Sequence, residues 1–307
     1  MISFRTHWKS LFICIGLFIF FLILRFPYQN FRGYLFAEIY KHSRILIVAE
    51  DIYPSLIGWP GIGIKKVDVT LPLGLSELEL SADRVIAKVG LGGLFPPVPS
   101  FSLSMRDLKK GGDLDLSFSQ SGNVISTTVE ADEVQLEQLK FSALPQSIIG
   151  KLIANSEFEI YSQDLTKSTG ELDLKVDNLK LPNINIQLSP MYGFVIPSMK
   201  VGELKIKGQI KNGTLELSQF QFGSKGSDLH GSVTGDIKLG RDILSSAANI
   251  MVKLDFSDAI KNSSQAVTLL SFLNTFKSTK SSGYAIQCRR PFRDAAACLL
   301  LPEPISE

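Results

Sequence analysis

The amino-acid sequence predicts a mainly β protein in which an N-terminal transmembrane helix precedes a long antiparallel curved sheet with a few short helices. Three observations lead to this prediction. Residues 11–24 form one apolar run, most of the chain after residue 44 alternates between apolar and polar residues, and turn signals such as Asn212-Gly213 separate the alternating segments. With 307 residues, the chain is long enough to bury a substantial core.

The apolar run LFICIGLFIFFLIL at residues 11–24 is the candidate membrane anchor. As a helix it would be about 21 Å long, and Trp8 and Phe26 extend it at the two membrane interfaces. The alternative is a cleaved signal peptide, but the segment RFPY at residues 25–28 lacks the small residues of a cleavage site. We therefore expect an uncleaved anchor at 11–26, preceded by a short cytoplasmic segment at 1–10.

Two opposing signals indicate on which side of the membrane the rest of the chain, which we call the body, lies. Basic residues follow the anchor as closely as they precede it, which argues weakly against export. Cys288 and Cys298 argue for it, because two strands joined by a turn would bring them together as a disulfide in an oxidising compartment. The alternative is a pair of free thiols in a cytosolic domain. We expect the body, residues 44–307, to be exported.

Residues 27–43 predict a short amphipathic helix or linker, since Phe31, Leu35 and Ile39 recur at a spacing of four. This apolar stripe either faces the membrane surface or closes the end of a sheet. Two further helices are expected inside the body. One lies around 148–153, and the other spans 267–276 after a pair of serines that can cap its start.

The alternating segments predict one dry and one wet face of the sheet, because residues two apart in a strand point to the same side. The candidate apolar face consists of Val67, Val69, Leu71, Leu114, Leu116, Phe118, Leu172, Leu174, Val176, Leu204, Ile206, Val252, Leu254 and Phe256. Such a face either packs against itself or another sheet as a sandwich core, or lines a trough that receives acyl chains or a partner's strand. Alternation alone leaves both arrangements open.

Catalytic and metal-binding patterns are missing from the sequence. The three histidines have no metal-ligand spacing. Ser227, Asp228 and His230 are neighbours, but alternation places Ser227 on the face opposite the other two, which argues against a serine triad built from them. Thirty-two basic and 30 acidic residues nearly balance, so nucleic acid is not an expected partner. The sequence therefore predicts a protein that is not an enzyme and needs no cofactor or metal.

Several segments resemble a known family. They are residues 25–69, with the end of the anchor, the short helix and the first strands, GELKIKG at 202–208, NGTL at 212–215 and GSVTGDIKL at 231–239. Together they resemble type II secretion system protein N (GspN) in the divergent form found in deltaproteobacteria and spirochaetes. The opening of anchor, helix and strand is also similar to that of AsmA-like proteins.

The resemblance to GspN implies a single-pass inner-membrane protein with the bulk of its chain in the periplasm. Its expected function is that of an accessory or structural component of a type II protein secretion system, with other secretion-system proteins as partners. The AsmA-like features imply an alternative function, a lipid-binding or lipid-transfer protein of the cell envelope. In that case an apolar groove would hold phospholipid acyl chains.

Overall fold

A computed structural model describes residues 14, 17, 18, 21, 25, 28–43, 46–55, 61–73, 76–92, 98–108, 111–138, 140–141, 148–189, 192–224, 226–241, 245–278, 283–291 and 301–302. The strands are β1 (Leu46–Ser55), β2 (Gly61–Leu73), β3 (Ser76–Gly92), β4 (Val98–Leu108), β5 (Asp113–Ser121), β6 (Val124–Gln135), β7 (Lys140–Phe141), β8 (Ile149–Tyr161), β9 (Thr169–Leu181), β10 (Ile184–Ser189), β11 (Tyr192–Ile196), β12 (Met199–Lys211), β13 (Thr214–Phe222), β14 (Leu229–Lys238), β15 (Ala247–Phe256), β16 (Tyr284–Pro291) and β17 (Leu301–Pro302). The helices are α2 (Tyr28–Ser43), α3 (Asp258–Lys261) and α4 (Val267–Leu273), with 3-10 turns at Leu136–Gln138, Leu165–Lys167, Ser264–Ala266 and Asn274–Phe276.

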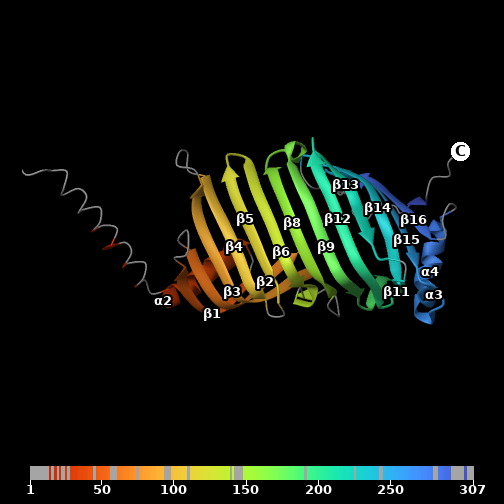
Figure 1. The fold of residues 1–307 in the computed structure, drawn as a ribbon, viewed down its shortest axis with the longest axis horizontal. Coiled ribbons are helices and arrows are strands. Elements are labelled where there is room, and N and C mark those ends of the chain that lie inside the picture. Colours follow the sequence, from red (N-terminus) through yellow and green to blue (C-terminus); the bar gives the residue numbers. More distant parts are fainter. Residues whose placement is uncertain are drawn as a thin grey trace, which may run out of the picture.

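One long antiparallel sheet dominates the molecule (Figure 1). In the described part of the chain its strand order follows the sequence from β1 to β6, then β8, β9 and β12 to β17, with β7 paired to β3. A separate two-stranded sheet joins β10 to β11. The predicted antiparallel meander is confirmed, and Asn212-Gly213 forms the turn between β12 and β13 with positive φ at both residues.

The predicted anchor at 11–26 falls largely outside the described residues. Within it, Cys14, Leu17, Phe18, Phe21 and Arg25 are described, and all five are helical and exposed. No helix within the described ranges is long and apolar enough to cross a bilayer.

Six strands share a four-residue pattern in which two polar residues face outward between two apolar residues that face inward. The segments are AEDI at 49–52, IKKV at 64–67, ADRV at 82–85, MRDL at 105–108, ADEV at 131–134 and VDNL at 176–179. In a regular strand, residues three apart point to opposite faces. Here, however, Ile64 and Val67 lie in the same buried cluster, as do Met105 and Leu108. Alternation is therefore interrupted once per strand, and we call this row of segments the bend.

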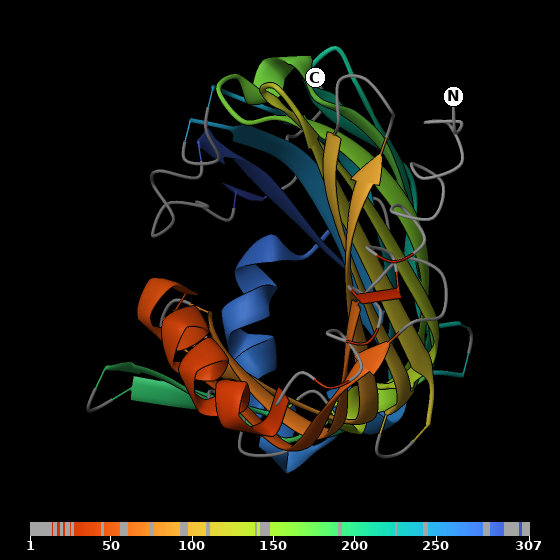
Figure 2. The same cartoon turned by 90° about the vertical axis from the view of Figure 1, so that its left-hand side faces the viewer.

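The bend gives the sheet its curvature. Lys65 pairs with Arg84, which in turn pairs with Arg106, so the interruptions are aligned from strand to strand. On four strands the bend contains a non-glycine residue with positive φ, namely Lys66, Asp107, Glu133 and Asn178. Such a residue redirects an extended chain. Figure 2 shows the result, because the strands curve along their length and the sheet is C-shaped in that view.

The outer side of the bend carries exposed ion pairs. Nitrogen–oxygen distances are 2.6 Å for Lys66–Glu50, 3.1 Å for Lys151–Glu133 and 2.9 Å for Lys175–Asp177. The hydrogen bond and the positive charge of Lys66 lower the pKa of Glu50. Any stability that this ion pair contributes is therefore fully present when the pH lies above the ordinary pKa of a carboxyl group. It is lost as the pH falls through the lowered pKa of Glu50. Exposed pairs of this kind contribute little, so apolar packing on the inner side must hold the bend.

Substitutions at Asp107 test the backbone geometry of the bend. A left-handed conformation costs a non-glycine residue about 1–2 kcal/mol, and Asp107 has a φ of 50°. We expect Asp107→Gly to be at least as stable as the parent and Asp107→Val to be about 1–2 kcal/mol less stable than the glycine variant. Urea denaturation of the three proteins measures the difference. Equal stability of the valine and glycine variants would contradict a strained bend.

The predicted helix around 148–153 is wrong. Residues Ile149 to Tyr161 form strand β8, and its pairing with β9 shifts register between Ile149 and Lys151. This bulge at Gly150 puts an extra residue into the strand. Beyond it, the apolar residues that face one side no longer fall at every second position. The apolar residues consequently fall at a spacing that imitates a helix. The prediction for 267–276 is confirmed by α4 and the 3-10 turn that follows it, and the Ser263 side chain accepts a hydrogen bond from the Gln265 backbone N–H at 3.3 Å.

Candidate functional site

The inner, concave face of the sheet is apolar from strand to strand. One row of directly paired residues crosses nine strands, β2 to β6, β8, β9, β12 and β13, without a polar side chain. It consists of Ile64, Val85, Met105, Leu114, Ala131, Ala154, Leu174, Ile206 and Phe220. Helix α4 identifies this side as the concave one, because it lies inside the curve in Figure 2 and packs on the apolar residues of β15 and β16.

The concave face is buried near the bend and increasingly open away from it. Val67, Leu108 and Val134 at the bend are each about 2% exposed. Farther along β4 and β5, Phe101 and Phe118 are 40% and 38% exposed, and they are directly paired across the two strands. The concave face is thus tightly packed at the bend and accessible at Phe101 and Phe118, which we call the aromatic rim.

All predicted residues of the apolar face lie in strands of this sheet. Val67, Val176 and Phe256 are buried, Phe118 is exposed, and Leu71 lies in β2 with its side chain outside the described set. The other nine are half-buried, namely Val69, Leu114, Leu116, Leu172, Leu174, Leu204, Ile206, Val252 and Leu254. Phe101 was missed, although Phe101, Leu103 and Met105 alternate with serines and arginine in the sequence and carry the same signal.

The N-terminal end of the concave face is closed by α2. Phe36 of this helix packs against the buried cluster at the bend. Arg32 Nη1 donates hydrogen bonds to the carbonyl oxygens of Ala49 and Glu50 at 3.1 and 2.7 Å, and Gln29 donates one to Asp51. Helix α2 therefore lies at this end of the sheet, and the two placements considered for its predicted apolar stripe stay predictions. The side chains of its predicted stripe, Phe31, Leu35 and Ile39, are outside the described set.

The C-terminal end is closed by α3 and α4. Leu269 and Leu273 of α4 pack with Phe256, Tyr284 and Ile286 of the sheet in a second buried cluster. The rings of Phe256 and Tyr284 meet edge to face, with centroids 5.9 Å apart. The open part of the concave face consequently lies between two covered ends.

The arrangement is a single curved layer instead of a sandwich. A sandwich needs a second sheet stacked about 10 Å from the first. In the described part of the chain, the only other sheet is the two-stranded pair β10–β11. The partly exposed apolar residues of β4, β5 and β9 are therefore not covered by a second sheet, as they would be in a sandwich.

Cys288 lies in β16, is 4% exposed and is disulfide-bonded. Cys14 is a free thiol. Cys298 lies outside the described residues, so its predicted pairing with Cys288 stays a prediction.

Ser227 and Asp228 have structural partners, whereas the buried Nδ1 of His230 has no hydrogen-bond partner among the described residues. The Asp228 carboxylate accepts hydrogen bonds from the Lys200 backbone N–H at 2.8 Å and from the Ser257 hydroxyl at 3.3 Å. The Ser227 hydroxyl accepts one from the Ser224 backbone N–H at 3.1 Å. Across the described ranges, no three His, Cys, Asp or Glu side chains are grouped closely enough to hold a metal ion.

The geometry thus offers one extended feature for binding, an apolar concave face with an accessible aromatic rim. Comparisons with protein-family models, with curated proteins and with solved structures find no match to this chain.

Proposed function

We propose that this protein binds the acyl chains of lipids on the concave face of its curved sheet. The observation that carries the proposal is the apolar concave face, which is buried where its nine-strand row passes the bend and accessible beside that row at Phe101 and Phe118. Apolar surface in water is unfavourable by about 25 cal/mol per Å². An acyl chain gains about 0.8 kcal/mol for each buried CH₂, so an extended chain is a fitting occupant.

The shape of the face favours an acyl chain over a compact ligand. Directly paired residues form continuous lines at right angles to the strands, and adjacent strands are about 4.8 Å apart. A flexible linear molecule can follow such a line over many strands. Within the described part of the concave row, charged groups that would select a small polar ligand are missing.

The resemblance to GspN and AsmA-like proteins supplies the proposed setting. In this setting the protein is a single-pass inner-membrane protein with its body in the periplasm, and it handles phospholipid without being an enzyme. Membership in a type II secretion system is a second proposal, supported by the sequence resemblance alone. Affinity purification of the full chain from its native membrane tests it, with secretion-system proteins as the expected partners.

Photo-crosslinking in living cells tests the lipid proposal without removing the protein from its membrane. A photoreactive phenylalanine analogue is placed at Phe118 on the concave face and, in a control protein, at Glu171, which is exposed on the opposite face. We expect phospholipid adducts at residue 118 and few at residue 171, as determined by mass spectrometry. No adduct at 118 in a folded protein, or equal adducts at both positions, would contradict the proposal.

A further inference from the structure

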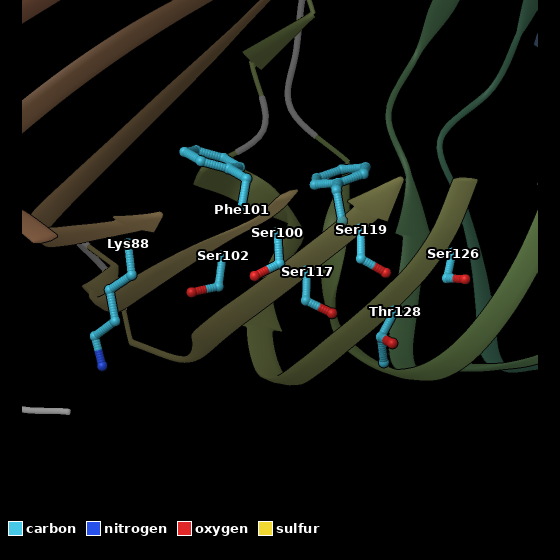
Figure 3. Close-up of a pocket in the computed structure, with 9 residues that line it drawn as sticks. Lys88, Ser100, Phe101, Ser102, Ser117, Ser119, Ser126 and Thr128 are labelled. Atoms are coloured by element: carbon cyan, nitrogen blue, oxygen red, sulfur yellow. The ribbon is translucent and has the colours of Figure 1, made fainter. Parts of the chain in front are cut away.

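The outer face of the sheet has a depression directly behind the aromatic rim. It has a volume of about 220 Å³ and is bordered by β3, β4, β5 and β6. Its lining comprises Lys88, Ser100, Ser102, Ser117, Ser119, Ser126 and Thr128, together with Phe101 and Phe118. Figure 3 shows the ring of Phe101 directed to the side opposite Lys88 and Ser102, so the ammonium and hydroxyl groups face away from the concave surface.

Strand register brings these polar groups together. Lys88 pairs with Ser102, Ser102 with Ser117, and Ser117 with Thr128, which makes one row across four strands. A second row joins Ser100, Ser119 and Ser126. Neighbouring members of a row are about 5 Å apart, as adjacent strands are. One tetrahedral anion can therefore reach hydroxyl groups on two strands and the lysine on a third.

The polar groups of the depression have no partner of their own among the described residues. Within the described ranges, no hydrogen bond or ion pair involves the Lys88 ammonium or any of the six hydroxyl groups. Elsewhere on this face, Lys66, Lys151 and Lys207 each contact a carboxylate. Among the described residues that line the depression there is no carboxylate. What it offers is a positive charge and a set of hydrogen-bond donors, which is the complement of an oxyanion.

We propose that this depression binds an oxyanion of the phosphate class, carried by the head group of a lipid. The lipid source rests on the proposed function, because Phe101 and Phe118 on the concave side of the same two strands would hold the acyl chains. The lipid would then lie over the rim of the sheet, with its head group outside and its chains inside. Glu159 and Glu157 pair with Ser126 and Thr128 on the next strand, so repulsion by these carboxylates places the anion toward Lys88.

The test compares two lipids that differ only in the phosphate. Full-length protein carrying the photoreactive residue at position 118 is placed in dodecyl maltoside micelles with equimolar phosphatidic acid and diacylglycerol of identical chains. We expect a preference of about tenfold for phosphatidic acid, the effect of one charge-assisted hydrogen bond. Lys88→Gln should abolish the preference. Lys253→Gln, which removes an exposed lysine from the outer face of β15, should keep it.

The outcomes separate the two proposals. Equal labelling by both lipids in the parent protein, or an unchanged preference in Lys88→Gln, would overturn the oxyanion site and leave acyl-chain binding intact. If neither lipid labels residue 118, the proposed function fails, and titration of the full chain with inorganic phosphate then decides the site. Phosphate binding that Lys88→Gln removes would support a site for free phosphate, and no phosphate binding would overturn it. A double variant, Ser102→Ala with Ser117→Ala, repeats the test should Lys88→Gln fail to fold.

Discussion

Replacing Leu108 by alanine is expected to lower the free energy of unfolding by about 2–5 kcal/mol. Leu108 is 2% exposed and belongs to the buried cluster on the inner side of the bend, where it pairs with Ala82. Because its pair partner is already small, the shortened side chain would leave a cavity that no neighbour can fill. The surrounding strands are joined by ladder hydrogen bonds and cannot close the gap.

Urea denaturation of the full chain, followed by circular dichroism, measures this effect. The matched control is Leu46→Ala, since Leu46 is 49% exposed on the edge strand β1 and should lose less than about 1 kcal/mol. Comparable losses in the two variants would mean that the bend is not the most tightly packed part of the sheet. The exposed ion pairs on its outer side would then have to contribute more than such pairs usually do.

The second large effect is expected for Phe256→Ala, with a loss of about 3–5 kcal/mol. Phe256 is 5% exposed beneath α4 and makes the edge-to-face contact with Tyr284. A charged residue at this position would be worse still, because an unpaired charge would be buried. Phe256 is one of the residues that the sequence assigned to the apolar face, which would either fill a core or line a trough. The structure shows Phe256 inside a filled core, so a charge there would destabilise the C-terminal end instead of reporting on lipid.

Thermal unfolding of Phe256→Ala beside Phe272→Ala checks this expectation. Phe272 lies on α4 and is 44% exposed, and its ring centroid lies 5.8 Å from that of Phe276. We expect its truncation to lower the melting temperature much less than truncation of Phe256. The opposite order would mean that α4 is held to the sheet by its exposed side and that the C-terminal end of the concave face is open.

Errors in the element predictions have a common physical origin. Residues 148–153 were predicted to be helical because a bulge changes the spacing of apolar residues in the same way as a helical turn does. The bend segments pose the same problem, since an apolar pair three residues apart fits a helix as well as an interrupted strand. Ladder pairing to neighbouring strands decides between the two, and this pairing involves residues far apart in the sequence.

The sequence by itself determined the mainly β class, the antiparallel meander, the turn at Asn212-Gly213, the C-terminal helix and the alternation that separates apolar from polar residues along the strands. Each of these depends on side-chain period or on local backbone preference, which neighbouring residues specify. Only the tertiary structure decided that no second sheet is stacked on the apolar face within the described part of the chain and that the two ends of this face are covered. The four-residue interruptions are visible in single strands, but they curve the sheet only because strand register aligns them. The same register gathers Lys88 and six hydroxyl groups from four strands into one depression.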